Sequence, residues 1–374
     1  IGISFYTFQQ IGFQIDKFNN SKKISFKKYF FFVSFFPQLI AGPILKFDEL
    51  KNQIDIFENK KIKYFLLFGF LIFLIGIFKK IIIADNIGYL IVDPIYENFN
   101  QLDFFSAWFF SIFFLFQIYF DFSGYTDMAI GLALMLGFTL PQNFKSPLKS
   151  KSILEFWNNW HITMTRFFRD YLFFSISLFL LRYFQNSSYL KFVNHNIPIV
   201  FAYLLVFSLI GLWHGAGWNF IVFGLLNGLL LGLNQIWRGM PFYSKVKSES
   251  IYKNICFYIT ILSVILVFAI FRLENIEQVL KIYFNIFSFS QLFILDNYNV
   301  EVLTKIFILI SIFIFLNITK NTEEIVNYLN NKFSNLKNWN KIAIISFFLI
   351  ILFSVIFKLY DINNSIGTFI YFQF

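Results

Sequence analysis

The stretch that decides the fold is IKYFLLFGFLIFLIGIFKKIIIA, residues 62–84, in which lysines are the only charged residues. A helix needs about 20 apolar residues to cross the hydrocarbon core of a membrane. Because lipid offers no partner to backbone N–H and C=O groups, such a stretch is predicted to be helical. Runs of the same kind lie at 29–47, 104–120, 122–140, 167–184, 197–213, 218–237, 254–271, 303–319 and 342–358. The sequence therefore predicts an all-α, multi-pass integral membrane protein.

The composition agrees with this fold class. Of the 374 residues, 57% are hydrophobic and 14% are charged, whereas roughly a quarter are charged in soluble domains. One soluble core cannot bury so much apolar surface, which excludes a soluble globular enzyme. No repeat, linker or shift in composition divides the chain, so residues 1–374 are predicted to form a single membrane domain. Ile1 opens inside an apolar stretch, and we expect this domain to be N-terminally truncated.

The excess of basic residues, 31 Lys and Arg against 21 Asp and Glu, gives a net charge of +10. In a multi-pass protein such an excess marks cytoplasmic loops, and no basic stripe indicates nucleic-acid binding. This rule places 145–151, 238–253 and 320–341 in the cytoplasm, and 185–196 and 272–302 outside. The chain must then cross the membrane an odd number of times between 185–196 and 238–253, yet residues 197–237 have the length of two spans. We therefore expect a re-entrant segment or a broken helix there, a form tolerated only where it lines a cavity or is buried in protein.

A histidine lies inside this stretch, in the sequence GLWHGAGWN at 211–219. Ionisable groups inside a membrane are costly and suggest function, and histidine exchanges protons near neutral pH. The glycines around His214 permit a break that presents the imidazole to a channel. The alternative is a helix-packing motif, since Gly211 and Gly215 have the spacing of close helix contacts and His214 would then only be hydrogen-bonded.

A second histidine follows two tryptophans in EFWNNWH, residues 155–161. A continuous helix would place Trp157, His161, Met164 and Phe168 on one face. Further along, the same helix would bring Arg166 and Asp170 together as an ion pair. Trp157 and Trp160 beside a basic loop resemble an aromatic belt at the membrane interface. The alternative is an amphipathic anchoring helix in which His161 is incidental.

The third polar segment, YFDFSGYTD at 119–127, places two carboxylates between apolar runs. Asp121 and Asp127 need partners or water there, and Gly124 suggests a kink. We predict a structural polar network of Asp121, Tyr125, Asp127, Arg166 and Asp170 rather than a nucleophilic Ser123, because no strand-turn-helix elbow surrounds the serine. With three histidines, one cysteine and no haem or zinc motif, no metal site is expected.

These segments together resemble the membrane-bound O-acyltransferase family, specifically its bacterial alginate and peptidoglycan O-acetyltransferases. The resemblance rests on GISFYTFQQIGFQID, FPQLIAGPI, YFDFSGYTDMAIGLALMLGF, FWNNWHITMTRFFRDYLF, LWHGAGWNF and FIYFQF. It implies a ring of transmembrane helices around a central tunnel, with re-entrant or broken elements. Members of the family contain further N-terminal helices, which agrees with the expected truncation.

The resemblance also implies a function. The protein would be an O-acetyltransferase of the bacterial inner membrane that moves acetyl from cytoplasmic acetyl-CoA, a substrate rather than a bound cofactor, towards hydroxyls of a cell-envelope or exported polysaccharide. His214 matches the histidine deep in the tunnel, and His161 matches a second one nearer the cytoplasm. Both are expected to be catalytic, with His214 as the general base. The residues expected to bind substrate are Trp157, Asn158, Trp160, Trp213 and Asn219. Expected partners are membrane lipid and a periplasmic SGNH-type transferase.

Two other classes of protein fit the same residues. A transporter or flippase could use the polar groups at mid-membrane to bind cargo without covalent chemistry, and a structural assembly subunit would use them for packing alone. Acetyl transfer that depends on His214 would separate the enzyme from both.

Overall fold

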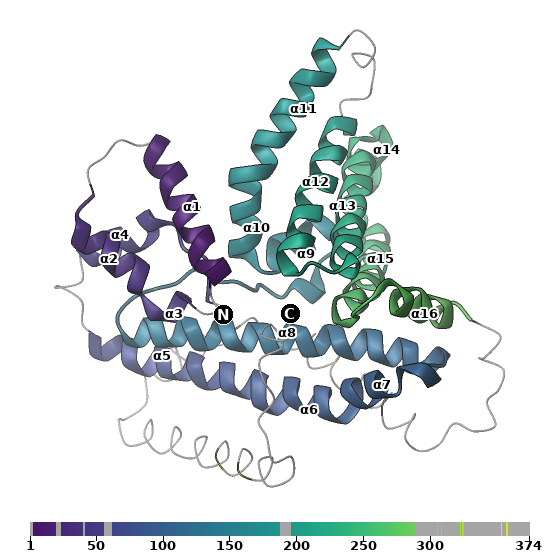
Figure 1. Ribbon diagram of the computed structural model, residues 1–374, viewed down its shortest axis with the longest axis horizontal. Helices are drawn as coiled ribbons and strands as arrows, with labels where there is room; N and C mark the ends of the chain where they lie inside the picture. The colour runs from purple at the N-terminus through teal and green to yellow at the C-terminus, as the bar shows by residue number, and fades with distance from the viewer. Residues whose placement is uncertain are drawn as a thin grey trace. The chain divides into compact units, whose positions relative to one another are not determined.

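The computed structural model describes residues 3–19, 24–39, 42–55, 62–187 and 196–288, with the single positions 305, 308, 322, 324, 353 and 357. Every secondary-structure element in this part of the chain is helical, which confirms the all-α class (Figure 1). The chain divides into two compact units, each described by itself. The first comprises Ile1–Asn86, Gln117–Lys145 and Lys320–Gln373, and the second comprises Ile87–Phe116 and Ser146–Thr319.

The helices of the first unit are α1 (Ile3–Asn19), α2 (Phe26–Ser34), α3 (Phe36–Leu39), α4 (Phe47–Asp55) and α5 (Ile62–Ile77), followed by a π-helical stretch, Phe78–Ala84, and the short α6 (Asp85–Ile87). Helix α8 (Phe104–Met135) contributes to both units. The second unit adds α7 (Asp93–Glu97), α9 (Ile153–Asn159), α10 (Ile162–Phe168), α11 (Phe174–Asn186), α12 (Asn196–His214), α13 (Trp218–Gly239), α14 (Pro241–Val246), α15 (Ser250–Ala269) and α16 (Ile276–Ile286).

Five helical segments of the described chain are long and apolar enough to cross a membrane: Leu66–Glu97, Phe104–Met135, Asn196–His214, Trp218–Gly239 and Ser250–Arg272. The predicted runs at 62–84, 197–213, 218–237 and 254–271 lie on these segments. The run at 167–184 is helical but is not among the five. The predicted spans at 303–319 and 342–358 lie outside the described residues.

Two of the predicted boundaries are wrong. The runs at 104–120 and 122–140 lie on the single helix α8. Asp121 does not end the helix, because its carboxylate pairs with Lys80. The run at 29–47 is not a span. It divides into α2 and α3, and residues 42–46 are not helical, as expected where Pro37 and Pro43 interrupt the backbone hydrogen bonds.

Glycines bring α5 and α8 into close contact within the first unit. A Cβ added to Gly76 would lie 2.5 Å from the carbonyl oxygen of Gly124, and one added to Gly69 would lie 2.5 Å from that of Gly131. The two pairs repeat after seven residues on each helix, so the same faces meet twice. Gly124 thus serves helix packing, and α8 continues through it without interruption.

In the second unit, α12 and α13 form an antiparallel hairpin around another row of glycines. Added Cβ atoms on Gly211, Gly224 and Gly228 would meet the backbone of the facing helix, at Phe220, Phe207 and Leu204 respectively. A break does lie here, since α12 ends at His214 and α13 begins at Trp218, but it is the turn between two helices of spanning length and not an interruption within one span. At the other end of the hairpin, Gln235 Nε2 donates to Asn196 Oδ1 at 3.2 Å. In Figure 1, α11, α12 and α13 run alongside one another.

This hairpin contradicts the predicted placement of 185–196 and 238–253 on opposite sides of the membrane. Both helices have spanning length. Helix α12 begins at Asn196 and α13 ends close to it, so the chain returns to the side from which it came. We expected an odd number of crossings between these loops, whereas the chain between them forms two helices of spanning length.

A labelling experiment checks this arrangement. With Cys256 replaced by serine, single cysteines at the exposed positions Gln185 and Lys247 should react with a membrane-impermeant maleimide from the same side of the membrane. The basic residues of 238–253 predict that this side is the cytoplasm. Reaction from opposite sides would show that α12 and α13 do not both cross.

Candidate active site

His161 occupies a break between two short helices. Ser152 caps α9, since its Oγ accepts from the backbone N–H of Glu155 at 3.1 Å. The helix ends at Asn159, and His161 has a φ of 44°, so that it caps α10 from the left-handed region. A non-glycine residue held there stores strain, which is a common feature of functional sites. The expected single helix with Trp157, His161, Met164 and Phe168 on one face is therefore wrong.

The tryptophans of α9 are buried rather than interfacial. Trp157 and Trp160 are 3% and 4% exposed. Trp157 Nε1 donates to Asn227 Oδ1 at 3.2 Å, and the ring of Trp160 lies 4.8 Å from that of Phe268, edge to face. This contradicts the interfacial belt and the anchoring helix, because α9 packs into the aromatic core of the second unit. Asn158, in contrast, is exposed.

His214 is the last residue of α12, at the turn of the hairpin. An added Cβ on Gly215 would meet the ring of Phe220, and one on Gly217 would meet Asn219 Oδ1, so the glycines of this turn leave room for their neighbours. The ring of Phe271 lies 4.9 Å from the imidazole, edge to face. Asn219 is 1% exposed, and its Nδ2 donates to the carbonyl of Leu273 at 2.6 Å.

The structure brings the two predicted histidines to one place. The ring of Trp213 lies 4.5 Å from that of His214 and 6.5 Å from that of His161, both within the range of aromatic pairs. Phe168 also contacts Trp213, with ring centroids 6.4 Å apart. Two polar segments that are far apart in the sequence thus meet at the turn of the α12–α13 hairpin.

The imidazole of His161 is held neutral by its surroundings. Burial lowers its pKa well below its ordinary value of 6.5, and the nearby His214 lowers the pKa further. Only 1% of the residue is exposed. At neutral pH His161 can therefore donate or accept a hydrogen bond without carrying charge.

This lowered pKa predicts how stability depends on pH. The unfolded chain takes up a proton on His161 below about pH 6.5, whereas the folded chain does not, so stability falls as pH decreases below that value. His161→Gln should lose less stability than wild type between pH 7 and pH 5. The check is the Tm of detergent-solubilised protein across this interval. Parallel Tm curves for the two proteins would contradict a neutral, buried His161.

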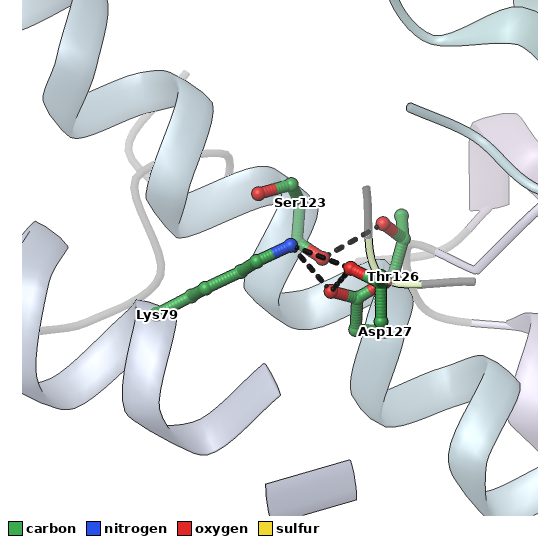
Figure 2. Close-up of polar contacts among 5 residues, drawn as sticks. Lys79, Ser123, Thr126 and Asp127 are labelled. Atoms are coloured by element: carbon green, nitrogen blue, oxygen red, sulfur yellow. Dashed lines mark hydrogen bonds and ion pairs between the residues drawn. The ribbon is translucent and has the colours of Figure 1, made fainter. Parts of the chain in front are cut away.

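Asp121 and Asp127, the carboxylates of the third polar segment, form ion pairs with lysines of the π-helical stretch Phe78–Ala84. Lys79 Nζ lies 2.6 Å from Asp127 Oδ2 (Figure 2). Thr322 Oγ1 accepts from Lys79 Nζ and donates to Asp127 Oδ2, at 2.9 Å each. Lys80 Nζ lies 2.6 Å from Asp121 and 2.6 Å from Asp85. We did not predict Lys79 and Lys80, although two adjacent lysines inside the apolar run 62–84 were a visible signal that carboxylates lie nearby.

The residues of the predicted polar network belong to both units, and each group is described by itself. Asp121, Tyr125 and Asp127 lie on the part of α8 that belongs to the first unit, and Tyr125 is half-buried. Arg166 and Asp170 belong to the second unit, where Arg169 Nε donates to Asp170 Oδ1 at 3.0 Å. No group of three or more His, Cys, Asp or Glu residues that could hold a metal ion exists among the described residues.

A double-mutant cycle measures the buried pair. Lys79→Met or Asp127→Leu alone should cost about 3–5 kcal/mol of unfolding free energy, because each leaves a charge buried without its partner, and the double variant should cost less than the sum. The exposed pair Lys28–Asp55 is the control, with each single change costing less than about 1 kcal/mol. Additive losses at Lys79 and Asp127 would show that the two charges do not depend on each other.

Comparison with known proteins identifies the family. The profile of the membrane-bound O-acyltransferase family matches residues 8–275. The peptidoglycan O-acetyltransferase of Helicobacter pylori is 31% identical over 75% of this chain and 55% of its own length. The probable alginate O-acetylase AlgI of Pseudomonas aeruginosa is 34% identical over 78% of the chain and 52% of its own length.

A more distant relative is the teichoic acid D-alanyltransferase of Streptococcus thermophilus, which is 26% identical over 63% of this chain and 57% of its own length. The chain thus spans about half the length of the curated relatives it matches. The family match covers the described polar segments, including both histidines. This chain belongs to the membrane-bound O-acyltransferase family.

Proposed function

We propose that the protein is a membrane O-acetyltransferase that takes acetyl from acetyl-CoA on the cytoplasmic side and passes it towards hydroxyls of a cell-envelope or exported polysaccharide. The observation that carries this proposal is the meeting of His161 and His214 around Trp213, at a helix break in a chain of this family. The relatives named for peptidoglycan and alginate acetylation support the acceptor class.

In this reaction His214 acts as a general base. Its imidazole removes the proton from the acceptor hydroxyl while the oxygen attacks the carbonyl carbon of the thioester. The C–S bond breaks, the sulfur of CoA leaves with the electron pair, and the proton on His214 passes to that sulfur. A positioned base of this kind typically contributes 10²–10⁴-fold in rate.

The second histidine has a different task. His161 is buried, and this burial lowers its pKa, so its neutral imidazole can hold the thioester carbonyl by a hydrogen bond without adding a charge. Asn158 is exposed, and we assign it to the donor-side entrance. Trp157 and Trp160 support this entrance from the core, and Trp213 separates donor from acceptor.

Partners and location complete the proposal. We place the protein in the bacterial inner membrane, with the acetyl donor reaching a tunnel from the cytoplasm and membrane lipid around the helices. A periplasmic SGNH-type transferase would finish the transfer onto the polysaccharide. This arrangement needs no bound cofactor, because acetyl-CoA is consumed as substrate.

The test is release of free CoA from acetyl-CoA by membranes that contain the full-length protein, the partner and the acceptor. His214→Ala should abolish release, because the variant loses the base, and membrane abundance measured alongside shows whether the lost ring contacts with Trp213 and Phe271 affect folding. His161→Ala should reduce release by roughly 10²-fold, the cost of misplacing a reacting group by about an ångström.

The controls separate the alternatives. Wild-type release by a normally abundant His214→Ala variant would rule out the general base. Wild-type membranes that release no more CoA than vector membranes would favour a transporter or flippase, since such a protein cleaves no thioester.

A further inference from the structure

The turn between α15 and α16 contacts three parts of the second unit, through the ring of Phe271, the guanidinium of Arg272 and the carbonyl of Leu273. The turn comprises Ile270–Leu273, of which Ile270, Phe271 and Leu273 are at most 3% exposed. It ends the candidate span Ser250–Arg272 and precedes the N-cap of α16 at Asn275.

Phe271 points from this turn to the candidate active site. Its ring contacts the imidazole of His214 at 4.9 Å with an interplanar angle of 80°. The same ring packs edge to face on Phe220 at 5.4 Å and on Phe223 at 5.3 Å, both on α13. The orientation of the His214 imidazole is therefore limited on one side by Phe271.

Asn219 ties the backbone of the turn to the hairpin that carries His214. It lies in the first turn of α13, five residues after His214, and its Nδ2 donates to the carbonyl oxygen of Leu273 at 2.6 Å. Gly217 leaves room for the Oδ1 of this amide, since an added Cβ would meet it. One side chain thus connects the glycine-rich turn after His214 with the carbonyl two residues after Phe271.

Arg272 fixes the turn from its other side. Its guanidinium lies 4.3 Å from the centroid of the Tyr96 ring and 3.8 Å from Asp93 Oδ1, both on α7. The hydroxyl of Tyr96 donates to Glu274 Oε1 at 2.9 Å. The turn is therefore held at Leu273 by Asn219 and at Arg272 by α7, with Phe271 between these two points.

We propose that Asn219 is a positioning residue for His214, which acts by holding the 270–273 turn so that Phe271 fixes the imidazole. This role rests on the proposed function, in which His214 is the general base. It differs from the substrate contact expected from the sequence, because the amide nitrogen already binds a backbone carbonyl and the residue is buried.

The kinetic test compares two buried asparagines. Asn219→Leu keeps the volume and removes the donor to Leu273. The control is Asn285→Leu on α16, where Nδ2 donates to the carbonyl of Lys281 at 3.0 Å in a side chain that is 5% exposed. Asn219→Leu should lower kcat for CoA release about 10- to 100-fold, with the KM for acetyl-CoA within about twofold of wild type. Asn285→Leu should keep wild-type kcat.

A second measurement does not depend on activity. Diethyl pyrocarbonate modifies accessible imidazoles, and its rate at His214 can be followed by peptide mass spectrometry on the full-length protein in membranes. The rate should rise at least about threefold in Asn219→Leu and in Phe271→Leu, because the turn no longer covers the ring, and should stay at the wild-type value in Asn285→Leu.

The outcomes separate the two proposals. Wild-type kcat and wild-type modification rates in folded Asn219→Leu and Phe271→Leu would overturn the positioning role. Equal losses in Asn219→Leu and Asn285→Leu would overturn it too, because they would reflect general destabilisation. Faster modification of His214 in a protein whose wild type releases no CoA would support the positioning of the ring and reject the proposed acetyl transfer.

Discussion

The close approach of α12 and α13 is the constraint on which the rest of the second unit depends. Glycines on both helices let their backbones meet, and this contact holds the hairpin whose turn presents His214. Helices in lipid gain little from burying apolar groups against each other, so close packing of small residues must supply the association. The α9–α10 break then has a fixed surface to pack on, which brings His161 to Trp213.

In the first unit the constraint is different, because charged side chains lie among apolar helices. Lys79 and Lys80 each meet a carboxylate of α8, and Gly76 and Gly124 bring the helices close enough for these short ion pairs. Charged groups among apolar helices are tolerated where partners satisfy them. Close glycine contacts therefore hold the turn that carries His214 in the second unit and the pair of helices that carries the lysines and carboxylates in the first.

Much of this could be predicted from the sequence. Hydropathy predicted the helical class and placed apolar runs on the five candidate spans of the described chain. The cost of a histidine inside a membrane directed attention to His214, and the family resemblance directed it to His161. The errors concern features that hydropathy does not encode. Asp121 looked like the end of a span because its partner Lys80 is distant in sequence, and Trp157 looked interfacial because burial in an aromatic core and exposure at an interface require the same residue type.

The break at His161 was missed for a related reason, since its left-handed backbone is imposed by packing rather than by a glycine.

The central claim is that both histidines serve one acetyl group. The most direct measurement is an experimental structure of the full-length protein with a non-hydrolysable acetyl-CoA analogue. The account predicts the analogue's carbonyl carbon within about 3–4 Å of a substrate hydroxyl or water held by His214, with His161 on the carbonyl oxygen. An analogue bound away from both imidazoles would contradict it.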